Sequence, residues 1–204
     1  MATTEAKVVE KITDNMKLFV SLVGKVKDDD VRKGLEDLVE EVGSKMAACP
    51  ASSNTKFIGA FPGGLVWHSI EVLKVMKELN KLYAADISSD SLILTALFHD
   101  IGKIGNKTHD YYEAQTSDWH VKKGMVFVIN EKLGPTPVSV RSLWWLATGV
   151  PLSEDEIGAI SSLQHMGHMY SSELYNAPML TLILQQAVRA VCTKNKGHKN
   201  VLED

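Results

Sequence analysis

The stretch from Leu92 to Gly105 constrains the fold more than any other part of the chain. It begins as an uncharged apolar run, residues 92–98, which predicts a helix that fills a core. His99 and Asp100 follow this run directly, and Lys103 comes shortly after them. Titratable side chains at the end of such a helix are costly to desolvate unless they are paired or hold a metal. Imidazole and carboxylate together form a ligand pair that suits Zn, Fe, Mn or Ni.

The segment Phe-His-Asp-Ile-Gly-Lys at 98–103 resembles the signature of the HD-domain superfamily of metal-dependent phosphohydrolases. In that family one helix carries an early His, a second helix carries the His-Asp doublet, and a late helix supplies a final Asp. Trp-His-Ser at 67–69 precedes the doublet by about thirty residues, as the early His does. The resemblance covers roughly residues 63–193. Within this family, the chain is similar above all to small HD proteins of tailed bacteriophages, which share segments like those at 65–69 and 117–120.

Apolar residues recur at spacings of three and four along most of the chain, which predicts amphipathic helices. The expected fold class is all-α, and the resemblance implies an HD-domain helical bundle. The length of 204 residues suggests one HD-type domain over 1–204, with an N-terminal helical pair at 1–48 packed on an HD core at 63–193. The predicted helices are 3–24, 29–47, 65–83, 89–101, 117–132, 138–148, 154–165 and 178–194.

The resemblance implies a metal pocket between separate helices. His68, His99 and Asp100 match the family's first ligands, while His120 and His165 match histidines that hold a second ion in its two-metal members. The expected cofactor is therefore one or two divalent transition-metal ions, among Mn, Fe, Zn, Co and Ni. The alternative interpretation of His68 is a buried structural histidine, and that of His120 is a histidine packed in the core or at the rim.

The last predicted helix departs from the family pattern at one position. Where the family has Asp in a context like Gln-Ala-Asp, this chain has Val188, and valine cannot coordinate a metal. Three explanations remain open. In the first, the remaining ligands bind metal and water takes the place of the missing carboxylate. In the second, Gln185 reaches the site as a weak neutral ligand. In the third, the site has lost its catalytic chemistry and is a binding pocket.

For an enzyme, the resemblance implies phosphoester hydrolysis by water that is activated by a metal held by His68, His99 and Asp100. The metal, together with Lys103 or Arg189, would offset charge on the phosphoryl oxygens. His120 or His165, whichever is not a metal ligand, could protonate the leaving oxygen, and His168 could contact the substrate. The alternatives are a di-iron HD-fold oxygenase and a catalytically impaired binding or regulatory protein, which the missing Asp favours.

Composition and charge limit the partners. The net charge is −3 without a basic stripe, so we expect a small phosphorylated metabolite or a nucleotide as substrate and no long nucleic acid. Two cysteines argue against a disulfide scaffold, and the N-terminal residues lack the pattern of a signal peptide. No uncharged run reaches membrane-spanning length. We therefore expect the protein to be located in the cytoplasm of a bacterium or of a phage-infected host and to have no membrane partner. A homodimer is left open.

Overall fold

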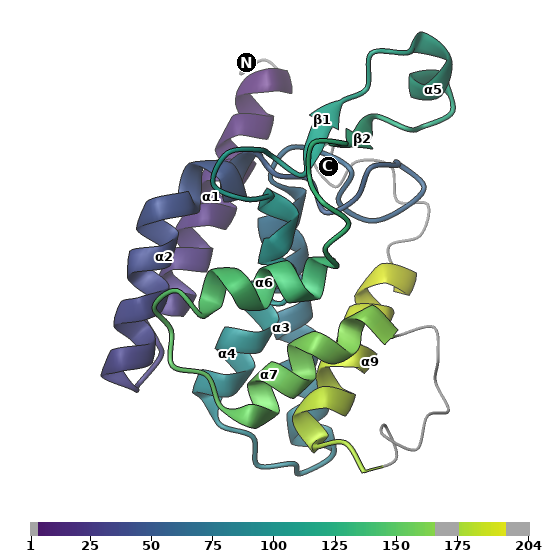
Figure 1. Cartoon of the computed structure of the whole chain (residues 1–204). Coiled ribbons are helices and arrows are strands. Elements are labelled where there is room, and N and C mark those ends of the chain that lie inside the picture. The colour runs from purple at the N-terminus through teal and green to yellow at the C-terminus, as the bar shows by residue number, and fades with distance from the viewer. Residues whose placement is uncertain (1–3, 166–175, 195–204) are drawn as a thin grey trace.

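The structure is a computed structural model, and it describes residues 4–165 and 176–194. Its described residues form a helical bundle with one small two-stranded sheet (Figure 1), so the predicted all-α class is confirmed. The elements are α1 (Thr4–Val23), α2 (Asp29–Ala48), α3 (Gly64–Leu82), α4 (Ser89–Phe98), the 3-10 helix η1 (Ile101–Ile104), β1 (Tyr112–Ala114), α5 (Asp118–Lys122), β2 (Phe127–Ile129), α6 (Val138–Leu146), α7 (Glu154–Ser161), the 3-10 helix η2 (Ser162–His165) and α9 (Met179–Lys194).

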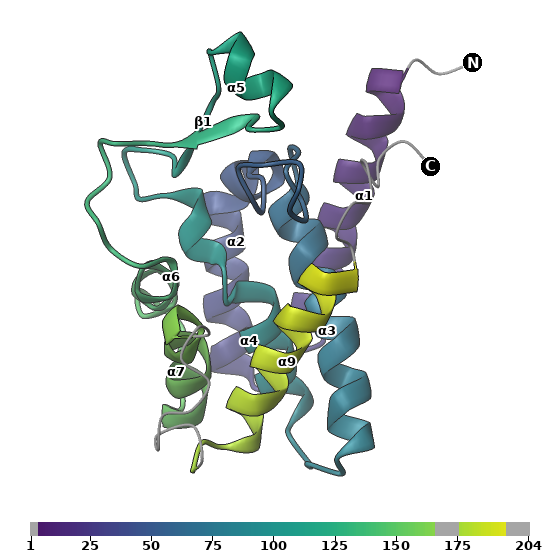
Figure 2. The same ribbon diagram turned by 90° about the vertical axis from the view of Figure 1, so that its right-hand side faces the viewer.

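The centre of the bundle is α3, which packs most extensively against α9 and α4. Figure 2 shows α9 lying along α3, with α6 and α7 on the far side of α4. Every residue of α4 from Leu92 to Phe98 is buried, which confirms that the uncharged run is a core helix. Burial of each large aliphatic or aromatic side chain contributes about 1.5–3 kcal/mol, so α4 anchors the elements around it.

The helical pair α1 and α2 packs against this centre from one side (Figure 1). The Phe19 ring of α1 meets the Phe98 ring of α4 edge-on, with ring centroids 5.3 Å apart. Asp28 caps α2 by accepting hydrogen bonds from the backbone N–H groups of Asp30 and Val31, as expected for a carboxylate at a helix start. The core is therefore shared between the N-terminal pair and the later helices.

The predicted helix at 117–132 is wrong. Only α5 is helical there, and β2 pairs antiparallel with β1, with Tyr112 opposite Ile129 and Ala114 opposite Phe127. Gly124 has φ of +85°, a left-handed conformation that ends the helical turn before the strand begins. The aromatic and β-branched residues of β2 suit the pleated pairing that β1 offers. We call the segment from β1 to β2, including α5, the hairpin, and it projects from the bundle in both views (Figures 1 and 2).

The predicted helix at 89–101 also ends earlier, at Phe98. The doublet therefore lies in the turn between α4 and η1, which leaves its side chains at the end of a rigid core helix. Among the described segments, no helix combines the length and the apolar character that a membrane crossing requires.

Candidate metal centre

The backbone of the doublet is held by the turn that follows it. His99 caps α4, and its N–H donates to the Thr95 carbonyl oxygen. Asp100 then takes φ of −109° and ψ of 9°, and the chain turns into η1. Gly102 lies so close to α6 that a Cβ atom there would be 2.3 Å from the Val138 carbonyl oxygen. Its N–H donates to the Ser142 hydroxyl at 2.9 Å, which joins η1 to α6.

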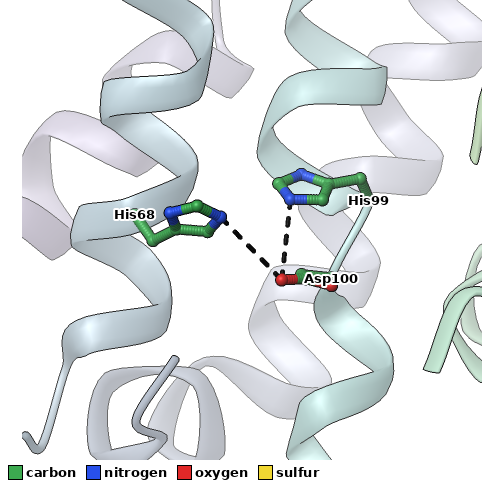
Figure 3. A group of neighbouring side chains, drawn as sticks. All are labelled: His68, His99 and Asp100. Carbon is green, nitrogen blue, oxygen red and sulfur yellow. Dashed lines mark ion pairs between the residues drawn. The ribbon is translucent and has the colours of Figure 1, made fainter. Parts of the chain in front are cut away.

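Two histidines from different helices converge on the Asp100 carboxylate (Figure 3). Nε2 of His68, on α3, lies 3.9 Å from Asp100 Oδ2, and Nε2 of His99 lies 3.6 Å from the same oxygen. The two rings meet edge-on, with centroids 5.4 Å apart. One ligand atom from each residue lies within 4.8 Å of the other two. The packing of α3 on α4 therefore assembles three of the predicted metal ligands into one cluster.

The hydrogen bonds of His99 fit a metal ligand. Its Nδ1 lies 2.8 Å from the Ala96 carbonyl oxygen, so Nδ1 carries the proton and Nε2 keeps its lone pair. This Nε2 is buried and has no hydrogen-bond partner among the described residues. A buried polar atom left without a partner costs about 1–3 kcal/mol, and a divalent cation bound there would remove that cost. The donor set of two imidazoles and one carboxylate suits a transition metal with open positions.

Burial also keeps both rings in the neutral form that binds metal. It lowers the pKa of His68 from its ordinary value of 6.5 to about 3, and the neighbouring His99 adds to this shift. Burial lowers the pKa of His99 in the same way. Each imidazole is therefore uncharged at neutral pH, with no proton to displace from the coordinating nitrogen.

The carboxylate is ionised, and its charge is offset by Lys103. The Lys103 ammonium lies 2.6 Å from Asp100 Oδ2. Burial by itself would raise the pKa of Asp100, but above all the Lys103 ammonium holds it below its usual range. Burial would lower the pKa of Lys103, but Asp100 above all raises it instead. The two side chains are 16% and 19% exposed, so they form a largely buried ion pair.

Two cavities adjoin this ion pair. Asp100 lines a cavity of about 400 Å³ together with residues of α6 and η2, among them Ser139 and Gln164. This volume is within the range of about 300–1,000 Å³ that is typical of small-molecule sites. Lys103 lines a second cavity, of about 160 Å³, on the α2 and hairpin side. Sequence patterns did not indicate either cavity, because their walls come from distant segments without a shared motif.

Of the other predicted site residues, His120 is not one of the clustered side chains, Arg189 is on α9, and the side chains of two histidines fall outside the described residues. His120 is on α5, where its ring packs edge-on against Trp119 with centroids 4.9 Å apart. Arg189 is an exposed residue of α9. The His165 side chain and all of His168 are outside the described residues. These assignments remain predictions.

Val188, the α9 residue that departs from the family pattern, has an apolar side chain in apolar surroundings. Val188 is partly buried and packs against the hydrophobic core. One turn earlier, Gln185 has a buried Nε2 atom without a hydrogen-bond partner among the residues described. The ligand role considered for Gln185 therefore also remains a prediction.

The described residues form a helical bundle with a cluster that could hold a metal ion, and comparison with known proteins shows what the chain is similar to. The family model described as HD domain matches residues 66–145, which include both histidines of the cluster and Asp100. This match supports the resemblance to the HD-domain superfamily. No solved structure matches the chain.

A curated relative is dihydroneopterin 2',3'-cyclic phosphate phosphodiesterase of Methanocaldococcus jannaschii, which is 28% identical over 118 residues. The match covers 48% of this chain and 47% of the relative, so the chain spans about half the length of the relative that it matches. The expected likeness to phage proteins remains a prediction.

Proposed function

We propose that this protein is a metal-dependent phosphohydrolase that acts on a small phosphate ester. The observation that carries the proposal is the convergence of His68, His99 and Asp100 from α3 and the end of α4. The phosphodiesterase name of the curated relative supports the same class of reaction. The 400 Å³ cavity beside Asp100 has the size of a site for a small molecule rather than a polymer.

His68, His99 and Asp100 would hold the ion through two imidazole nitrogens and one carboxylate oxygen. A bound divalent transition metal supplies Lewis acidity, which makes hydroxide available near neutral pH. The core helices hold these three side chains before any substrate arrives, so little reorganisation is needed during the reaction. The low pKa of Asp100 keeps its carboxylate available at neutral pH.

Lys103 would bind the phosphoryl group. Its ammonium already lies beside Asp100, and a phosphoryl oxygen bound there would accept a charge-assisted hydrogen bond from it. The positive charge offsets negative charge that builds up on the phosphoryl oxygens when the ester P–O bond breaks. The leaving oxygen then takes up a proton, and we keep His120 as the candidate donor. Arg189 and His168 remain candidates for substrate contact.

The experiment uses the full chain purified without chelator, with metal content measured by mass spectrometry. Release of nitrophenol from p-nitrophenyl phosphate and bis(p-nitrophenyl) phosphate is followed with Mn, Co, Ni, Zn or Fe added. We expect release that depends on the metal and falls to background in Asp100→Asn. The matched control is Asp37→Asn, which alters an exposed carboxylate paired with Lys33. Release that survives Asp100→Asn or needs no metal would contradict the proposal.

The second candidate is a catalytically impaired HD protein that binds its ligand without turnover. Val188 favours it, because this side chain packs against the core where the family has a carboxylate ligand. A Val188→Asp variant separates the two candidates in the same assay. Turnover by the native chain supports the enzyme, whereas turnover by the variant alone supports the impaired protein. Oxygen uptake by the iron-loaded chain tests the di-iron oxygenase alternative.

A further inference from the structure

The smaller cavity beside Lys103 is built by three parts of the chain that are distant in sequence. Lys45 and Ala48 reach it from the end of α2, Lys103 from η1, and Tyr112 and Phe127 from the two strands of the hairpin. Figure 2 shows the hairpin above the end of α2, where these segments meet. We call this cavity the ring cavity. Its volume of about 160 Å³ is below that of a complete small-molecule site, so it has room for one part of a ligand.

The walls of the ring cavity are aromatic and apolar. The rings of Tyr112 and Phe127 have centroids 6.2 Å apart and planes inclined at 52°. Two alanines, Ala48 and Ala114, line the cavity and leave it open because their side chains are small. Aromatic walls favour a planar ligand with a polarisable face, since offset or edge-on ring contacts add to the burial of apolar surface.

Charged side chains also line the ring cavity. Lys45 Nζ lies 3.0 Å from Asp110 Oδ1 and donates to the Asn106 carbonyl oxygen at 3.0 Å. Both Lys45 and Asp110 line the cavity, so its walls also carry hydrogen-bond donors and acceptors. A hydrocarbon ring would leave such groups without a ligand partner, whereas a heteroaromatic ring carries nitrogen and oxygen atoms that can hydrogen-bond to them.

Lys103 connects the ring cavity to the metal centre. It lines the cavity, while its ammonium contacts Asp100 Oδ2 at 2.6 Å. If the phosphoryl group of a ligand lies at Lys103 and Asp100, the organic part of that ligand would therefore extend into the ring cavity. We propose that the ring cavity binds the heteroaromatic ring of a phosphate-ester substrate, with Tyr112 and Phe127 as specificity-determining residues. This inference rests on the proposed function for the position of the phosphoryl group.

The test measures binding to the full chain without added metal, so that hydrolysis does not interfere. The probes are adenosine, guanosine and cytidine 5'-monophosphates, with ribose 5-phosphate as the probe without a ring. Stacking of a base on aromatic side chains favours binding with little dependence on which base it is. We therefore expect at least one nucleotide to bind about tenfold tighter than ribose 5-phosphate in calorimetry. Equal affinity of all four probes would overturn the inference.

Ala48→Phe fills the ring cavity from α2 and leaves the hairpin residues unchanged. We expect it to remove the tenfold preference and to leave the affinity for ribose 5-phosphate as it was. Ala190→Phe is the matched control, because Ala190 is an exposed alanine of α9 outside the cavity walls. Tyr112→Leu removes an aromatic ring from the hairpin side of the cavity, and it should also reduce the preference for the nucleotide. A preference that survives both variants with intact thermal unfolding would also overturn the inference.

The result is independent of the hydrolysis assay. Loss of the proposed function appears as absent nitrophenol release in the metal-loaded chain. Failure of the ring cavity appears as absent discrimination between probes in the chain without added metal.

Discussion

The ammonium of Lys103 lies 2.6 Å from Asp100 Oδ2, the same oxygen that faces Nε2 of His68 and of His99. The cation at one end of η1 thus offsets the charge of a carboxylate in the turn before it. Two opposite charges that are largely removed from water depend on one another, because either one alone would be an uncompensated buried charge. This relationship makes the stability of the chain sensitive to Lys103 and to any cation that can take over its role.

Lys103→Met should destabilise the metal-free chain by about 1–3 kcal/mol, less than a fully buried pair would lose because both side chains are partly exposed. A divalent cation at Asp100 would restore a positive charge, so added Mn²⁺ should stabilise the variant more than the native chain. Urea unfolding with EDTA and with Mn²⁺ measures both effects. Lys33→Met, at an exposed pair with Asp37, should cost at most about 1 kcal/mol. If Lys103→Met lowered the free energy of unfolding equally in EDTA and in Mn²⁺, a cation at Asp100 would not be replacing the charge of Lys103.

Stability of the metal-free chain should fall as the pH falls from 6.5 toward 5. Burial lowers the pKa of His68 from 6.5 to about 3 and lowers that of His99. Below pH 6.5 the unfolded chain therefore binds protons at these positions while the folded chain does not, which favours unfolding. Each histidine contributes up to about 1.4 kcal/mol per pH unit. Urea unfolding at pH 7, 6 and 5 in EDTA measures the slope.

Removing one of these histidines should reduce the pH dependence. His99→Gln takes away one buried imidazole, so the loss of stability between pH 6 and 5 should be smaller than in the native chain. His109→Gln is the control, because His109 is partly exposed and contacts the Thr108 hydroxyl. An unchanged slope in His99→Gln would show that other groups cause the acid sensitivity.

Metal removal should lower the thermal stability of the native chain. A ligand that binds only the folded state stabilises it by about 2.7 kcal/mol at one hundred times its dissociation constant. Differential scanning calorimetry of chain loaded with Mn²⁺, before and after EDTA, should therefore give a lower melting temperature after chelation. Asp100→Asn removes the anionic ligand and should abolish the difference. A melting temperature that EDTA leaves unchanged in metal-loaded native chain would contradict metal binding by the cluster.

Gly102→Ala should disrupt the turn that carries Asp100. The added Cβ would lie 2.3 Å from the Val138 carbonyl oxygen and 2.8 Å from the Ser142 nitrogen, so α6 and η1 must move apart. Overpacking of this kind costs about 1–3 kcal/mol. Gly158→Ala is a matched control, since nothing lies within 4 Å of its Cβ position in α7 and alanine favours a helix. Chemical denaturation and metal binding measured on both variants check the prediction.

Much of the fold could be predicted from local patterns, because the side chains that form each helix face are close together in sequence. The apolar run 92–98 predicts the core helix α4, and the spacing of His68 from the doublet indicates that two helices bring ligands together. The error at 117–132 has a non-local cause. Residues 127–129 pair with β1, a partner that helical periodicity does not reveal.

The sequence by itself determined the all-α class and the core helix, and it pointed to the three side chains that form the cluster, because each depends on a short pattern or a recognisable motif. Only the tertiary structure decided that Lys103 neutralises Asp100, that the hairpin replaces a helix, and that α2, η1 and the hairpin enclose the ring cavity. These features depend on distances between segments, and such distances follow from how the whole core packs.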